Sequence, residues 1–200
     1  MVPTRLAAVF ALAALLAACA SRPVIPGRDG PHPNPPPGLH LVPDAQPRLE
    51  PIRFGGPNKP YQVDGRLIVP LTADVPLRER GGASWYGIKY HGRPTSSGEP
   101  YDMFAMSAAH RTMPIPSYAR VRNPANGREI VVRINDRGPF VDGRVIDLSY
   151  TAALRLGVLG GVAPVEVERI THEEIRAGGR ASARRDDDEG DDPRARALLP

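Results

Sequence analysis

The middle of the chain alternates apolar and polar residues over short runs, and turn residues separate one run from the next. Ile130, Val132 and Ile134 occupy every second position, which is the pattern of a strand with one buried face. Similar runs, or short apolar runs between turn residues, predict further strands at 82–87, 119–122, 145–148 and 163–170. One pattern is helical, because Ser149 is placed to cap a brief helix that ends at Gly157.

Asn126-Gly127 lies between two predicted strands and is a strong hairpin signal, because both residue types tolerate positive φ. Five or six short strands with one or two helical turns fit a small closed β-barrel, since closure removes exposed sheet edges. We therefore expect a mainly β protein with one barrel over 82–171, a size that folds without disulfides but with modest stability. A pre-barrel segment, 59–81, precedes it, and residues 61–75 of that segment would add a strand or run along the barrel surface.

The N-terminus carries a signal for export. Arg5 precedes an apolar run over 6–16, which is too short to cross a bilayer as a helix but long enough for a signal peptide. The run ends in Leu16-Ala17-Ala18-Cys19, which resembles the lipobox of bacterial lipoproteins. That resemblance implies that residues 1–18 are removed and that Cys19 is lipidated. An ordinary signal peptide with Cys19 near its cleavage site is the alternative.

Cys19 is the only cysteine of the chain, so it cannot form an internal disulfide, and lipidation explains it better. Several acyl chains on one residue would give a lasting membrane anchor, whereas a single chain holds only marginally. Because Ala20 rather than aspartate follows the cysteine, we expect the periplasmic face of the outer membrane.

Composition predicts tails on both sides of the barrel. Of the 24 prolines, many lie in 19–58, where they favour an extended tether; a proline-rich ligand for a partner domain is the alternative. Dense mixed charge over 172–200 predicts disorder. The formal net charge of +4 is too small to indicate a nucleic-acid partner.

Three segments, 87–103, 108–114 and 132–149, hold more polar and turn residues than a scaffold needs. Their motifs read Ala83-Ser84-Trp85-Tyr86-Gly87, His91-Gly92-Arg93, Gly98-Glu99, Ala108-Ala109-His110, Asn135-Asp136-Arg137-Gly138-Pro139-Phe140 and Ile146-Asp147-Leu148-Ser149. In this order and spacing they resemble the rare lipoprotein A family over about 82–170. Lys59-Pro60-Tyr61 resembles the short motif that precedes the barrel in that family.

The resemblance implies a six-stranded double-psi β-barrel and endolytic lytic transglycosylase activity. Such enzymes break the bond between N-acetylmuramic acid (MurNAc) and N-acetylglucosamine (GlcNAc) without consuming water and leave 1,6-anhydro ends, in wall remodelling or daughter-cell separation. The family's catalytic residues fall on Glu99 and Asp136, and His110 matches a further functional position. Asp147 matches an aspartate that expansin-like relatives need at their polysaccharide groove.

Two departures from the family pattern stand out. Thr95-Ser96-Ser97-Gly98 replaces the more usual Thr-Ala-Asn-Gly before the glutamate, which is a mild change. No sporulation-related repeat follows the barrel in this sequence, and that module directs many members to the septum. We therefore expect the substrate to be found through the barrel and tether, with division-site proteins as possible partners.

The residues themselves fit glycosidic chemistry, which needs an acid for the leaving oxygen and a carboxylate as base or stabiliser. The adjacent Arg137 favours the ionised form of Asp136, which suits a base. Glu99 has less positive charge beside it, so it is the better acid if burial raises its pKa. A charged turn at Asp136 and an inert loop glutamate at Glu99 are the alternatives.

Five residues are expected to bind substrate: Trp85, Tyr86, His91, Arg137 and Asp147. The two aromatic residues among them suit a sugar-stacking platform, although core packing is the more probable place for Trp85. His110 is either a catalytic orienter or a hydrogen-bonded core histidine. No histidine pair has metal-ligand spacing, so we expect neither metal nor cofactor. An expansin-like module that binds peptidoglycan without cleaving it, or an envelope scaffold protein, is the rival function.

Overall fold

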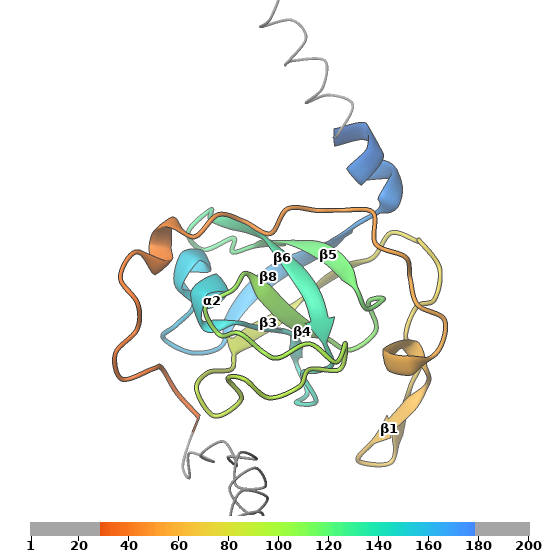
Figure 1. Cartoon of the computed structure of the whole chain (residues 1–200), viewed down its shortest axis with the longest axis horizontal. Coiled ribbons are helices and arrows are strands. Elements are labelled where there is room, and N and C mark those ends of the chain that lie inside the picture. The colour runs from red at the N-terminus through yellow and green to blue at the C-terminus, as the bar shows by residue number, and fades with distance from the viewer. Residues whose placement is uncertain (1–28, 179–200) are drawn as a thin grey trace, which may run out of the picture.

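A computed structural model describes residues 29–178 of the chain. Six strands close into a barrel in the order β3-β7-β4-β6-β5-β8 (Figure 1). Their bounds are β3 Arg78–Trp85, β4 Ser107–His110, β5 Ser117–Arg122, β6 Glu129–Asp136, β7 Arg144–Leu148 and β8 Ala163–Ile170. The pairs β3–β7 and β4–β6 are parallel, and the other neighbours are antiparallel. The predicted fold class, a mainly β protein with a six-stranded closed barrel, is confirmed.

The barrel interior is filled by the apolar positions that the alternation singled out. Ile130, Val132 and Ile134 of β6 are at most 1% exposed and pack with residues of the other strands. β4 went unrecognised in the alternation because every one of its residues is buried, so it shows no polar face. β3 begins earlier than expected, because Arg78 and Arg80 pair with acidic residues of β8 on the outer surface.

Helix α2 (Tyr150–Leu156) lies where the sequence predicted a helix. Ser149 Oγ accepts a hydrogen bond from the backbone N–H of Ala152 (3.1 Å), and Gly157 ends the helix in the left-handed conformation. This capped turn holds Leu156 and Ala152 in the core beside the barrel.

The pre-barrel segment forms a separate hairpin of β1 (Tyr61–Val63) and β2 (Arg66–Ile68), which stands beside the barrel in Figure 1. Asp64 at its turn has φ +49°, and Gly65 follows with φ +74°. The hairpin is therefore separate from the barrel sheet. Of the two expected arrangements, the addition of a strand to the barrel is wrong.

Residues 39–58, here named the strap, cross the barrel surface and include the 3₁₀ turns η1 (Leu39–Leu41) and η2 (Gly56–Asn58) (Figure 1). Asp44 forms an ion pair with Arg155, and the backbone N–H of Ala45 donates to the Val131 carbonyl (3.0 Å). In the described structure this part of the expected tether thus lies against the barrel, because its polar groups find partners there.

The chain after the barrel differs at one point from the expected disordered tail, because residues 172–178 are helical. Thr171 and Glu174 form a reciprocal capping box, with the Thr171 N–H donating to Glu174 Oε2 (2.8 Å) and the Glu174 N–H to Thr171 Oγ1 (3.3 Å). Cys19, the expected signal peptide and residues 179–200 lie outside the described residues. Between 29 and 178 no helix is long and apolar enough to cross a membrane.

Candidate active site

Four neighbouring strands place two aspartates on one face of the barrel. Ser84 of β3 pairs with Asp147 of β7, Asp147 with Ala109 of β4, and Ala109 with Asp136 of β6. Directly paired residues point to the same side of a sheet, and neighbouring strands lie about 4.8 Å apart. Asp136 and Asp147 therefore flank the small side chain of Ala109, with their backbones about 10 Å apart by the same spacing.

Asp136 is held by its neighbours through one oxygen. Its Oδ1 accepts hydrogen bonds from Ser96 N–H (2.9 Å), Ser96 Oγ (2.7 Å) and the Arg137 N–H (2.8 Å). Within the described part of the chain, Oδ2 has no hydrogen-bond partner. This oxygen is therefore the free acceptor of the carboxylate.

Asp147 has the electrostatic properties of an acid. Burial raises its pKa, while the hydrogen bond from Ser84 Oγ and the nearby guanidinium of Arg144 (3.6 Å) partly oppose the rise. Its side chain retains 19% exposure, so the carboxyl group remains reachable from solvent. Burial thus favours the protonated form of this carboxyl group.

Glu99 reaches the site on a turn that docks onto the end of β6. The Thr95 N–H and Oγ1 both donate to the Glu99 carbonyl (2.8 and 2.9 Å), and Gly98 between them adopts φ +89°, which favours glycine. The Ser97 N–H donates to the Asn135 carbonyl (3.0 Å). Together with the Ser96 bonds to Asp136, these contacts bring the two predicted catalytic carboxylates to the same strand end.

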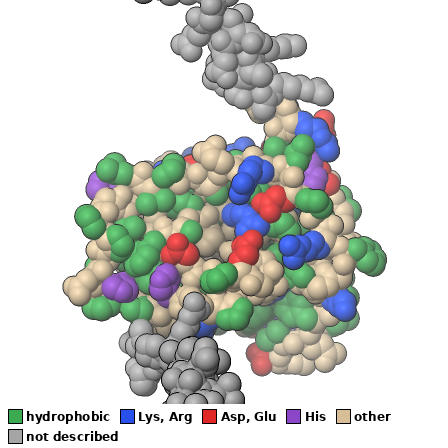
Figure 2. Space-filling model, viewed as in Figure 1, with side chains coloured by type: hydrophobic (Ala, Val, Ile, Leu, Met, Phe, Trp, Pro, Cys, Tyr) green, Lys and Arg blue, Asp and Glu red, His purple; other side chains and the backbone are tan. Residues whose placement is uncertain are grey.

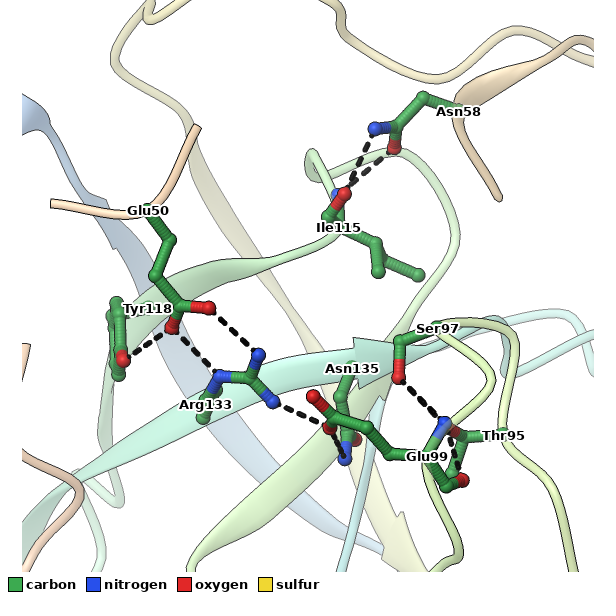
Figure 3. Close-up of polar contacts among 9 residues, drawn as sticks. All are labelled: Glu50, Asn58, Thr95, Ser97, Glu99, Ile115, Tyr118, Arg133 and Asn135. Atoms are coloured by element: carbon green, nitrogen blue, oxygen red, sulfur yellow. Dashed lines mark hydrogen bonds and ion pairs between the residues drawn. The ribbon is translucent and has the colours of Figure 1, made fainter. Parts of the chain in front are cut away.

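The condition under which Glu99 would be the better acid, a pKa raised by burial, is not met. Its side chain is 46% exposed, and Arg133 Nη1 donates to its Oε2 at 2.6 Å, with Asn135 Nδ2 at 3.4 Å (Figure 3). The hydrogen bond from Arg133 lowers the pKa of Glu99, so the group is an anion at neutral pH. The protonation of Glu99 is therefore decided by Arg133, a residue 34 positions away in sequence, and not by an adjacent charge.

The surface around Glu99 is concave. A cavity of about 570 Å³ is lined by Glu99, Arg133 and Asn135 together with four strap residues: Pro43, Ala45, Gln46 and Arg48. Figure 2 shows acidic and basic side chains gathered in a column over β6, the strand that supplies Arg133 and Asn135. Side chains of both charge signs thus lie together on this part of the surface.

His110 has the contacts of a core histidine. It is fully buried, its Nδ1 accepts hydrogen bonds from the N–H groups of Thr112 (3.2 Å) and Met113 (3.0 Å), and its Nε2 lies 3.5 Å from Glu79 Oε2. It follows Ala109 on β4, so it points to the opposite side of the sheet from the two aspartates. The structure places it behind the site, where it orders the turn over 110–113.

Arg137 also turns away from the site. Its guanidinium donates to the backbone carbonyls of Pro57 (3.0 Å), His110 (3.0 Å) and Met113 (2.6 Å) and to Asn58 Oδ1 (2.7 Å). Burial lowers its pKa to about 10. Only its backbone N–H faces Asp136, so the side chain fastens the strap instead of presenting a charge to substrate.

The two adjacent aromatic residues serve different purposes. Trp85, expected to bind substrate or to pack in the core, is partly buried: it packs against the core, donates from Nε1 to the Leu159 carbonyl (3.2 Å) and meets the Tyr150 ring edge-on. Tyr86 stacks on Tyr101 with ring centroids 4.0 Å apart. Burial raises the pKa of Tyr86, and the neighbouring Tyr101 and the two aspartates add to the rise. Its hydroxyl is buried and has no hydrogen-bond partner among the described residues.

His91 belongs to the loop that precedes Met103. Its Nδ1 accepts from the Met103 N–H (3.2 Å), and its ring packs on Phe104 with centroids 5.4 Å apart. Its side chain is 39% exposed, and its contacts stay within its own loop and Phe104. Among residues 29–178 no group of three or more histidine, cysteine or acidic side chains could hold a metal ion.

Sequence reasoning missed several residues of the site. Ser84 and Ser96 stood in the quoted motifs, and their hydroxyl groups proved to be carboxylate partners. Phe140 is 44% exposed, and a Cβ at Gly138 would lie 4.0 Å from its Cε2 and 3.8 Å from Asp147 Oδ2. Phe140 is the last residue of the quoted aspartate motif, so the motif itself was the signal for an aromatic side chain near the carboxylates.

The barrel matches a known family of proteins. Residues 78–167 match the family model described as lytic transglycolase. Proteins named endolytic peptidoglycan transglycosylase RlpA are similar to the chain, including one from Vibrio cholerae that is 48% identical over 163 residues, which are 78% of this chain and 60% of the relative. One from Neisseria meningitidis is 48% identical (64% of this chain, 53% of the relative), and one from Pseudomonas aeruginosa is also 48% identical (64% and 38%).

This chain therefore spans 60% or less of the length of these relatives. Among solved structures, Streptomyces papain inhibitor aligns with a TM-score of 0.39 and 25% identity over 47% of this chain and 94% of that protein. The family model covers all six barrel strands except the last residues of β8, and the six motifs quoted from 83–149 lie inside it. Over residues 78–167 the barrel of this chain matches the lytic transglycolase family, as its motifs predicted.

Proposed function

We propose that the chain is an endolytic peptidoglycan lytic transglycosylase that breaks MurNAc–GlcNAc bonds and leaves 1,6-anhydroMurNAc ends. The observation that carries the proposal is the pair of aspartates on one face, flanking Ala109, of which Asp147 has a raised pKa. Two carboxyl groups that point from one sheet face toward the same site can serve as acid and base on one sugar, because the glycosidic oxygen and the 6-hydroxyl of β-linked MurNAc lie on the same face of its ring. The names of the relatives support the same reaction class.

The proposed reaction transfers one proton in and one proton out. Asp147, protonated, donates to the glycosidic oxygen, and the C1–O bond breaks so that GlcNAc leaves as the O4 alcohol. The MurNAc 6-hydroxyl attacks C1 as positive charge develops there, and Asp136 Oδ2 takes its proton. The products are the 1,6-anhydro end and a free GlcNAc end, and no water is consumed.

Glu99 acts in this scheme as an anion. Its pKa is lowered by Arg133, so it suits stabilisation of positive charge on the sugar better than proton donation. Glu99→Gln keeps the shape and removes the charge, so it should abolish turnover with little change in thermal unfolding. His110 is a positioning residue here, because its ring contacts the turn at 112–113 and Glu79.

The exposed ring of Phe140 is the proposed stacking surface for a sugar next to the cleaved bond. It lies beside Gly138 and Asp147, and aromatic faces bind the apolar faces of sugars well. Trp85, His91 and Arg137, expected to bind substrate, support the site through their packing and hydrogen bonds.

The proposed setting is the cell envelope, with the protein anchored through lipidated Cys19 at the periplasmic face of the outer membrane. Peptidoglycan glycan strands are the partner, and division-site proteins are further partners in this proposal. Cys19→Ser should move the protein from the membrane fraction to the soluble fraction. Unchanged fractionation would contradict the anchor.

Purified protein incubated with sacculi, and separately with amidase-stripped sacculi, tests the proposed function. We expect 1,6-anhydro products, detected by mass spectrometry, and none from Asp136→Asn. Protein that sediments with sacculi but releases nothing would favour the expansin-like binding module. Protein that neither binds nor cleaves would leave the envelope scaffold.

A further inference from the structure

The strap carries an acidic residue, Glu50, onto the outer face of the β5–β6 pair (Figure 3). Arg133 and Tyr118 are direct cross-strand partners there. Glu50 Oε1 accepts from Arg133 Nε (2.8 Å) and Tyr118 Oη (2.6 Å), and Oε2 accepts from Arg133 Nη2 (2.8 Å). Glu50 is 83 residues away from Arg133 in sequence and lies outside the residues matched by the family model.

The bidentate contact fixes the plane of a rigid group. A guanidinium is planar, so hydrogen bonds at Nε and Nη2 also determine where the Nη1 hydrogens point. Nη1 is the atom that donates to Glu99 Oε2 at 2.6 Å. The orientation of Glu99 therefore depends on a carboxylate of the strap through one intervening side chain.

The electrostatic contacts link the same three residues, Glu50, Arg133 and Glu99. Two carboxylates share one guanidinium, and the side chains of Arg133 and Glu50 are only 19% and 25% exposed. The hydrogen bond from Arg133 lowers the pKa of Glu50 to about 2, so Glu50 is ionised at neutral pH. Glu50 thereby compensates much of the Arg133 charge, which would otherwise fall entirely on Glu99.

We propose that Glu50 is a positioning residue for catalysis, which orients Arg133 and through it holds Glu99 in place at the site. This inference rests on the proposed function for its kinetic consequence but not for the coupling itself. It extends the catalytic apparatus from the barrel to the strap.

A purely mechanical role for Glu50, in which it only fastens the strap, is the competing explanation. The strap provides a matched control, because Asp44 forms an ion pair with Arg155 and has no contact with Glu99 or Arg133. Asp44→Asn removes a strap ion pair of similar exposure and leaves the Glu50 contacts intact. If fastening alone mattered, Asp44→Asn and Glu50→Gln would have similar kinetic effects.

Kinetics of the full chain on glycan strands test the proposal. Glu50→Gln should lower kcat by about 10- to 100-fold, the range expected for a small displacement of a catalytic group, with KM changed less than about twofold. Asp44→Asn should retain kcat within about twofold by the same reasoning. In an Arg133→Met background, Glu50→Gln should have no further effect, because its only route to Glu99 is gone.

A second measurement is independent of activity. ¹³C NMR of the Glu99 carboxyl carbon, with pH, should give a lower pKa in Glu50→Gln than in the parent protein, because Arg133 then directs its whole charge to Glu99. An identical Glu99 titration in the two proteins, or equal kinetic losses in Glu50→Gln and Asp44→Asn, would overturn the proposal. If the titration moves but the parent protein forms no anhydro product, the coupling holds and the proposed function fails.

Discussion

Ser84 provides a direct test of which carboxyl group is the acid. Its Oγ donates to Asp147 Oδ1, and this bond stabilises the ionised form of a group whose pKa burial has raised. Ser84→Ala removes the donor, so the pKa of Asp147 should rise further. A hydrogen bond to a charged group contributes about 1.5–3 kcal/mol, and 1.36 kcal/mol corresponds to one pH unit. Because Asp147 keeps some contact with water, we take the lower end, about 1 pH unit.

The sign follows from the role of the group. An acid acts in its protonated form, which is present below its pKa and is lost as pH rises through it. The basic limb of the profile of kcat/KM against pH should therefore move up by about 1 pH unit in Ser84→Ala. The assay is release of anhydro ends from glycan strands across the pH range, with folding checked by circular dichroism at each pH.

Ser96→Ala is the matched control for that experiment. Ser96 Oγ donates to Asp136 at 2.7 Å, so the same chemical change now removes a donor from the proposed base. A base acts in its ionised form, and loss of the Ser96 donor makes that form less stable. The acidic limb of the profile of kcat/KM against pH should therefore move to higher pH, while the basic limb stays in place. A basic limb unmoved by Ser84→Ala, or one limb that responds to both substitutions, would refute the assignment of acid and base.

Three further predictions concern the fold and the groove. Burial raises the pKa of Asp147, so the contribution of this group to the free energy of unfolding is greatest below its unfolded pKa and is lost as pH rises through the folded pKa. Asp147→Asn should therefore abolish turnover yet unfold at the same or a higher temperature at neutral pH. A lower Tm would contradict this. Phe140→Ala should raise KM several-fold by removing a stacking surface, whereas Phe54→Ala, at a ring 97% exposed on the strap, should not; equal effects would argue against stacking. Asp74→Asn should cost about 3–5 kcal/mol, seen as a fall in Tm, because Arg169 is 1% exposed and would lose its carboxylate partner; a loss under about 1 kcal/mol would contradict it.

The predictable part of the fold was the part with local signals. Alternation located β6 and β8, and Ser149 with Gly157 marked both ends of α2, because these patterns depend on residues a few positions apart. β4 lacks a polar face, so only its motif drew notice. The closed order of the strands depends on pairings between distant segments, which single-sequence periodicity does not encode.

The site was predictable as a set of residues but not as a set of roles. Asp136, Asp147 and Glu99 were all expected, and the structure brings them to one end of the barrel. The protonation of Glu99 depends on Arg133, which is 34 residues away, so the condition of a pKa raised by burial is not met. Arg137 is adjacent to Asp136 in sequence, yet its side chain is directed to the strap, because its buried guanidinium needs several acceptors.

The strap shows why composition alone describes this region poorly. Proline content predicts an extended chain, and the strap is indeed without regular strands or α-helix. Composition carries no information on where the polar residues between the prolines find partners. Glu50 and Asn58 are paired with groups 83 and 57 residues away, and these pairs decide that the strap lies on the barrel.

The central claim is that the glycosidic bond is broken by internal attack of the MurNAc 6-hydroxyl. Digestion of purified glycan strands in H₂¹⁸O, followed by mass spectrometry of the new chain ends, tests it most directly. We expect 1,6-anhydroMurNAc ends without ¹⁸O from the parent protein and no new ends from Asp136→Asn. Reducing MurNAc ends that carry one ¹⁸O would show that water is the nucleophile and would contradict the account.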